Sequence, residues 1–65
     1  MPLSAKQTQV LALLASGQSN KAIAQALDIS ENTVKFHLKN IFAQLSVDNR
    51  TAAISAALQQ GLLKP

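Results

Sequence analysis

A chain of 65 residues has room for one small domain, and because it contains no cysteine, disulfide bonds and thiolate zinc sites are excluded. Apolar residues make up 48% of the chain but only two residues are aromatic, which predicts a core of alanine, leucine and isoleucine. No apolar run reaches the roughly 20 residues that a transmembrane helix needs, and no secretion signal is recognisable. The net charge of +3 is modest for a protein that binds nucleic acid, and by itself it is equally consistent with a charge that only maintains solubility.

The first predicted element is a helix over residues 4–16. Ser4 and Gln7 have the spacing of a capping box, in which each side chain accepts a hydrogen bond from the backbone N–H of the other residue. Gly17 is expected to end this helix, because glycine readily adopts the left-handed conformation that follows many helix C-termini.

A second, shorter helix is predicted over residues 20–27, with Ser19 as its N-cap. Ile23 and Leu27 are four positions apart, so their side chains share one face. Ala24 lies beside them and is small enough for another helix to cross closely at this point.

Asp28, Ile29 and Ser30 interrupt the helical pattern and predict a sharp turn. Aspartate tolerates a left-handed backbone, Ile29 can fill the corner, and serine is a good N-cap. A third helix is expected over residues 31–45, with four apolar residues on one face: Val34, Leu38, Ile41 and Leu45. Two helices joined in this way are typical of a helix-turn-helix, whose second helix lies in the major groove of DNA.

The opposite face of this third helix carries a single aromatic ring among mostly polar and basic residues: Asn32, Lys35, Phe36, Lys39, Asn40 and Ala43. In a major groove the ring of Phe36 can pack on thymine methyl groups while the flanking lysines reach guanine or phosphate. The alternative interpretation is that Phe36 covers a neighbouring helix or a partner surface.

A fourth helix is predicted to begin after an N-cap at Asp48 or Asn49 and to end at Gln60, before Gly61. The sequence contains no strand-like alternation of β-branched and polar residues. We therefore expect an all-α fold, a tetrahelical helix-turn-helix bundle with a three-helix core and a C-terminal fourth helix, in one domain over residues 1–65.

The apolar residues of the fourth helix fall on two sides. Ala53 and Ala57 are small enough to pack tightly against the first helix. Packing within one domain is expected to leave the second side, with Ile54 and Leu58, unused. Such a side is either a contact for a partner or part of the scattered apolar surface that soluble proteins commonly have.

Short motifs stand at characteristic spacing along nearly the whole chain: Leu3-Ser4, Val10-Leu11 with Leu14, Gly17-Gln18-Ser19-Asn20-Lys21, Ile23-Ala24, Ile29-Ser30, Thr33-Val34-Lys35 with His37, Asn40-Ile41, Leu45 with Val47, Asn49-Arg50-Thr51 with Ala52-Ala53, and Gly61-Leu62. In this arrangement the chain resembles the LuxR-type (NarL/FixJ-like) DNA-binding domain of bacterial transcription regulators. The resemblance implies sequence-specific binding to double-stranded DNA in the regulation of transcription.

The resemblance also implies roles for individual residues. The positions that would read base edges are Lys35, Phe36 and Lys39. The residues that would contact the DNA backbone are Asn20, Lys21, Asn32, Thr33 and Asn40, whose amide, hydroxyl and ammonium groups suit phosphate oxygens. A symmetric dimer on an inverted repeat would use the second side of the fourth helix: Thr51, Ile54, Ser55 and Leu58. A purely local role at the helix start is the alternative for Thr33, and a solvated charge is the alternative for Lys21.

The chain departs from the family pattern mainly by the loss of acidic residues. Lys6-Gln7 replaces the usual Arg-Glu pair, and Gln9 and Ala22 stand where acids are common. Asp28 replaces a frequent glycine. These changes put in question any family salt bridge to Arg50 that used the missing acids.

No arrangement of residues supports catalysis, a metal or a cofactor. Ser4, Ser19 and Ser30 are interpreted as helix caps, because no base and orienting acid accompany them. His37 is the only histidine and has no second ligand at metal-binding spacing, so we expect it to be a packing residue at the edge of the apolar face.

Two alternative functions remain open at this stage. A promoter-reading helix-turn-helix of a sigma factor would be expected to carry a longer basic recognition region, which this chain lacks. A helical protein-interaction module would use Phe36, Ile54 and Leu58 as its contact surface. The preferred interpretation implies the C-terminal domain of a larger regulator in the bacterial cytoplasm, close to the nucleoid, with RNA polymerase as a further partner.

Overall fold

The computed structural model describes residues 3–63, in which four helices follow one another along the chain. Helix α1 spans Ala5–Ala15, α2 spans Asn20–Leu27, α3 spans Glu31–Leu45 and α4 spans Arg50–Gln59. The described residues contain no strand, which confirms the prediction of an all-α, tetrahelical fold. Each predicted helix end agrees with the structure to within one residue.

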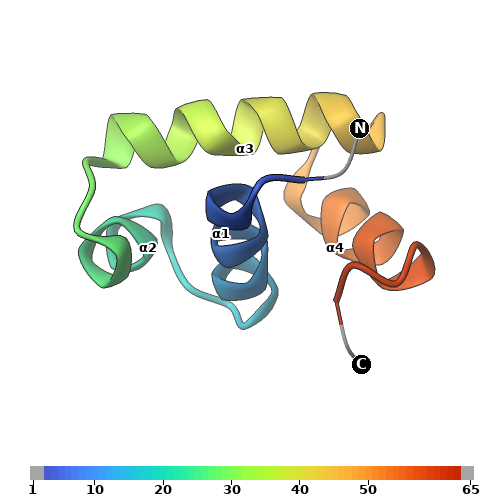
Figure 1. The fold of residues 1–65 in the computed structure, drawn as a ribbon, viewed down its shortest axis with the longest axis horizontal. Helices are drawn as coiled ribbons and strands as arrows, with labels where there is room; N and C mark the ends of the chain where they lie inside the picture. The colour runs from blue at the N-terminus through green and yellow to red at the C-terminus, as the bar shows by residue number, and fades with distance from the viewer. Residues whose placement is uncertain (1–2, 64–65) are drawn as a thin grey trace.

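Helix α3 extends along one side of the molecule, and the other three helices lie on its opposite side (Figure 1). It packs against each of them, with α2 and α4 near its two ends and α1 between them. The longest dimension of the molecule is 28 Å and the other two are 21 and 20 Å. One side of α3 therefore helps to form the core, while its other side has no helix of the domain over it.

All four helices begin at a polar N-cap residue in extended conformation. The side chains of Ser4, Ser19, Ser30 and Asn49 each accept a hydrogen bond from the backbone N–H three residues later, at 2.8–3.1 Å. The Ser4 N–H in turn donates to Gln7 Oε1 at 2.9 Å, which confirms the predicted capping box. These caps supply partners for N–H groups that a helix cannot satisfy internally.

A residue with positive φ follows each of the four helices, and Gly61 after α4 has φ +74°. Gly17 after α1 has φ +89°, and Asp28 at the end of α2 has φ 56° and ψ 48°, as the sequence predicted for a tight turn. The Ile29 N–H then donates to the Ala24 carbonyl at 3.0 Å, which closes the turn between α2 and α3. Ser46 at the end of α3 also has φ 58°, a conformation that the sequence analysis did not predict.

The core consists of small and aliphatic side chains contributed by all four helices: Val10, Leu11, Leu14, Ile23, Ala24, Val34, Leu38, Ile41, Leu45, Ala53 and Ala57. The four predicted apolar positions of α3 are all buried, and Ala53 and Ala57 are completely buried. Small residues in α4 allow its backbone to approach α1 and α3, both of which it packs against.

One expectation about α4 has to be corrected. Ile54 was predicted to lie on a side that packing leaves unused, but it is half-buried against the core. Ile54 lies roughly 80° around the helix from the centre of the Ala53 and Ala57 stripe, whereas Leu58 lies roughly 120° away. Leu58 accordingly keeps 43% of its surface exposed.

Candidate nucleic-acid interface

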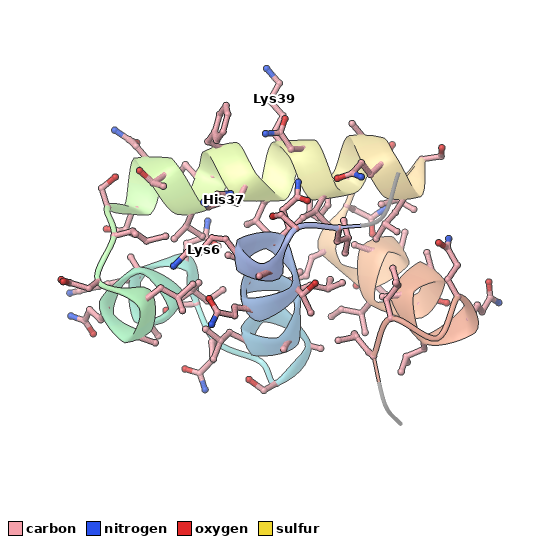
Figure 2. All side chains as sticks on the ribbon, in the orientation of Figure 1. Lys6, His37 and Lys39 are labelled. Carbon is pink, nitrogen blue, oxygen red and sulfur yellow. The ribbon has the colours of Figure 1, made fainter. Side chains whose placement is uncertain are left out.

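The outer side of α3 is the most distinctive surface of the molecule. Lys35, Phe36 and Lys39 are all exposed there, opposite the buried side of the same helix. Figure 2 shows the Lys39 side chain extending away from the other three helices, whereas Lys6 lies on the opposite side of α3. Because Lys35 and Lys39 are one helical turn apart, their side chains project in nearly the same direction. The structure thus brings the three predicted base-reading residues together on one open surface.

Phe36 is 60% exposed, an unusual environment for a large apolar side chain. Its ring meets the ring of the half-buried His37 edge to face, with 6.0 Å between the centroids and 62° between the planes. This contact restricts the Phe36 ring from one side and leaves most of it in solvent. With 60% of its surface exposed, Phe36 is not buried under a neighbouring helix, and contact with a partner surface stays the alternative to DNA reading.

The N-terminus of α3 is organised by two hydroxyl groups. Ser30 Oγ accepts from the Thr33 N–H at 3.0 Å, and the hydroxyls of Ser30 and Thr33 lie 2.9 Å apart, with either as donor. One hydroxyl hydrogen is used between them, so the other can donate to an additional acceptor. Thr33 therefore has the local role considered above and can still take part in binding an anion. Asn32 beside Thr33 is exposed. Asn40, which lies about two turns further along α3, is half-buried.

The N-terminus of α2 presents a second polar surface. The Ser19 side chain accepts from the Ala22 N–H at 3.1 Å, and the Ser19 carbonyl accepts from the Ile23 N–H at 2.9 Å. The N–H groups of Asn20 and Lys21 lie at the open end of the helix, where they have no intrahelical acceptor. The Lys21 side chain is exposed and that of Asn20 is half-buried.

Arg50 connects α4 to the loop that leads into α2. Its Nη2 donates to the Gln18 carbonyl at 2.7 Å, across 32 positions of sequence. The sequence predicted no hydrogen bond between Arg50 and the loop before α2. The one signal was its place as the first residue of a helix, where a positive charge is opposed by the helix dipole.

The predicted dimer residues lie apart from these surfaces, on α4. Thr51, Ser55 and Leu58 are exposed, and Ile54 is half-buried. The structure thus places them on one helix that includes the exposed apolar side chain of Leu58. Among residues 3–63 there is no cluster of three side chains that could hold a metal ion, and no helix long and apolar enough to cross a membrane.

A family model described as bacterial regulatory proteins of the luxR family, GerE, matches residues 1–57. The chain belongs to the luxR family. This assignment confirms the resemblance inferred from the sequence motifs. It also confirms the prediction that the chain is a helix-turn-helix domain that binds DNA in the regulation of transcription. The luxR family is a family of regulators and not an enzyme class.

Curated relatives of this luxR-family domain include transcription regulators from several bacteria. The chain is 49% identical over 61 residues to the HTH-type transcriptional regulator AlkS of Alcanivorax borkumensis, covering 94% of the chain and 7% of that protein. It is 53% identical over 51 residues to the putative HTH-type transcriptional regulator YhjB of Escherichia coli, covering 78% of the chain and 26% of that protein. The chain thus spans only a small part of these relatives.

Two solved structures of bacterial regulators have the same fold as the chain. The chain superposes on the response regulator ChrA of a heme-sensing two-component system with a TM-score of 0.94 and 52% identity, covering 97% of the chain and 31% of ChrA. Its TM-score with the transcription factor GerE is 0.90 at 35% identity, covering 95% of the chain and 92% of the GerE chain.

Proposed function

We propose that this luxR-family domain binds duplex DNA sequence-specifically by placing α3 in the major groove. The observation that carries the proposal is the exposed trio Lys35, Phe36 and Lys39 on the side of α3 opposite the core. An α-helix fits the major groove, where lysine can donate to the acceptors on guanine and an apolar ring can contact thymine methyl groups. Phe36 is exposed in the free domain, so it can make that contact without rearrangement.

Residues at the starts of α2 and α3 would hold the DNA backbone on either side of the groove. Asn20 and Lys21 lie at the open end of α2, where free N–H groups and the helix dipole favour a phosphate. At the start of α3, Asn32 and the remaining hydroxyl hydrogen of the Ser30 and Thr33 pair can donate to a second phosphate. Asn40, half-buried beside the reading surface, is the fifth backbone contact in this proposal.

The proposal is tested by selecting bound sequences from a random duplex pool with the domain. A domain that reads bases enriches one short motif, and binding to that motif weakens steeply as salt is added, because phosphate contacts release counterions. Recovery of no motif by the folded domain would contradict sequence-specific reading.

The exposed apolar side chains also favour one alternative function, a protein-interaction module. Phe36 and Leu58 are the two large apolar side chains exposed among residues 3–63, and a helical protein-interaction module would use such groups. Docking of that kind depends little on salt, whereas DNA binding depends on it strongly. Measuring how the affinity of the domain for its selected duplex changes with added salt therefore distinguishes the two functions.

The domain is further proposed to bind as a dimer on an inverted repeat through α4. Leu58 is exposed, and Thr51 and Ser55 lie on the same short helix, so a two-fold contact could bury their surfaces against the same residues of a second copy. The area available on one 10-residue helix is small, and a stable interface buries about 800 Å² per partner. We therefore expect pairing mainly on DNA.

A larger regulator is the proposed context of the domain, because the chain spans only 7% and 26% of the two relatives described above. In that context the domain would act in the bacterial cytoplasm at the nucleoid, and the bound regulator would contact RNA polymerase. An RNA polymerase pull-down with the full-length regulator on its operator tests the second statement.

A further inference from the structure

The hydrogen bond from Arg50 to the Gln18 carbonyl joins two parts of the proposed interface that are remote in sequence. Its 2.7 Å length is that of a strong, charge-assisted bond. The helix dipole disfavours a cation at the start of α4, so local helix stability does not account for arginine at this position. The long-range bond does give the side chain a function.

The carbonyl that Arg50 holds belongs to the peptide unit directly before Ser19. On the other side of the same residue, the Gln18 N–H donates to the Leu13 carbonyl at 3.2 Å, which fixes the loop to the end of α1. Ser19 then caps α2 through the Ala22 N–H. The loop is thus attached to α1 before Gln18 and to α4 after it, immediately before the helix that carries Asn20 and Lys21.

We propose that Arg50 is a positioning residue for DNA binding. By holding the Gln18 carbonyl it fixes the direction in which the N-terminus of α2 presents Asn20 and Lys21 to a phosphate. It also connects this end of α2 to α4, the helix proposed to mediate pairing. The inference rests on the proposed function, and it assigns Arg50 no contact with DNA itself.

The first experiment measures amide hydrogen exchange in the free domain for the parent, Arg50→Ala and Lys6→Ala. Lys6→Ala is the matched control, because it removes one positive charge from an exposed residue on the side of α3 away from Lys39. In Arg50→Ala the amides of Gln18, Ala22 and Ile23 are expected to exchange about three- to tenfold faster, the range for loss of one hydrogen bond. Exchange at the Ile41 amide, in the buried part of α3, monitors global stability.

The Arg50→Lys variant separates the loss of this hydrogen bond from a general loss of stability. Arg50→Lys keeps the charge but places its donor one bond closer to the backbone, without the planar fork of arginine. Its loop exchange is expected to lie between those of the parent and Arg50→Ala. Unchanged loop exchange in both Arg50 variants would overturn the proposal.

The second experiment is a double-mutant cycle on a selected duplex, with Arg50→Ala, Lys21→Ala and the double variant. Arg50→Ala is expected to weaken binding several-fold more than Lys6→Ala does. If Arg50 acts through Lys21, the loss in the double variant is smaller than the product of the two single losses, by more than the roughly twofold error of additivity. Additive losses would mean that Arg50 acts independently, for example on a phosphate, and would refute the positioning role.

The two experiments fail in different ways. If the parent domain binds no duplex, the proposed function is wrong and the role of Arg50 in DNA binding is wrong with it. If the parent binds DNA but Arg50→Ala behaves as Lys6→Ala does, only the positioning role is refuted.

Discussion

At the scale of single residues, Lys35 and Lys39 allow DNA reading to be tested apart from folding. Both are exposed on the outer side of α3. Replacing either lysine with alanine should cost about 1–3 kcal/mol of operator binding if that lysine contacts a base. The thermal melt should change little, since exposed substitutions usually alter stability by less than about 0.5 kcal/mol.

The measurement is a fluorescence anisotropy titration of each variant on the selected duplex and on duplexes with single base changes. Lys6→Ala serves as the control for the loss of one charge. If Lys35→Ala and Lys39→Ala both keep the affinity and base preference of the parent, α3 is not the reading helix.

Lys21 should behave differently, because its proposed contact is with phosphate. Lys21→Ala should weaken binding to every duplex by a similar factor and reduce the slope of log K against log salt by about 0.9, the value for one phosphate contact. Titrations at several salt concentrations measure this slope. A change in base preference without a change in slope would argue for a base contact instead.

Glu31 has opposite effects on the helix and on DNA binding. It is exposed in the first turn of α3, where an acid stabilises the helix by about 0.3–1 kcal/mol, yet the same charge repels an approaching phosphate. Glu31→Gln should therefore bind DNA more tightly and melt at a slightly lower temperature. Asp48→Asn removes the same charge before α4 and should change DNA affinity less. Weaker DNA binding by Glu31→Gln would count against this arrangement.

At the scale of helices, the close approach of α2 to its neighbours depends on Ala24. Its side chain is only 5% exposed, and α2 packs against both α1 and α3. Ala24→Leu should overpack this site and lower the free energy of unfolding by about 1–3 kcal/mol. Ala26→Leu adds the same atoms to an exposed position of the same helix and should melt close to the parent. Equal melts for the two variants would reject a tight crossing at Ala24.

The helices could be predicted from the sequence because their determinants are local. Ser19, Ser30 and the Ser4 and Gln7 pair act within three residues, and the apolar spacing of α3 reports directly which side is buried. The left-handed Ser46 could not be predicted, since serine has no marked preference for that conformation. In the structure the Val47 N–H donates to the Phe42 carbonyl at 2.9 Å across this turn.

Interactions between remote positions were the part that the sequence did not reveal. The bond from Arg50 to Gln18 depends on how α4 packs beside α1, and the half-burial of Ile54 depends on the same packing. The base-reading and dimer assignments came from family resemblance, and they stay predictions. What the structure adds is the exposure of the side chains that those roles would require.

At the scale of the whole molecule, dimerisation is tested better by a substitution at Leu58 than by one at Ile54. Leu58→Glu should place like charges together across a two-fold contact and abolish cooperative binding to a duplex with two half-sites, about 34–36 Å apart centre to centre. Binding to a single half-site and the thermal melt should be nearly unchanged, because Leu58 is 43% exposed. Ile54→Glu is less informative, since half-buried Ile54 also packs against the core.

Band-shift titrations on one-site and two-site duplexes measure the cooperativity. Gln59→Glu is the control, because it adds the same charge to an exposed position on a different side of α4. If Leu58→Glu binds the two-site duplex as cooperatively as the parent, α4 does not mediate pairing.

The two sides of α3 differ in which substitutions the fold tolerates. Val34, Leu38, Ile41 and Leu45 hold the domain together, while Lys35, Phe36 and Lys39 touch little of it. If the exposed trio reads bases as proposed, exchanges there would create new operator preferences at almost no cost in stability. A gene duplicate could diverge toward a different set of promoters by a few such exchanges, with every intermediate still folded.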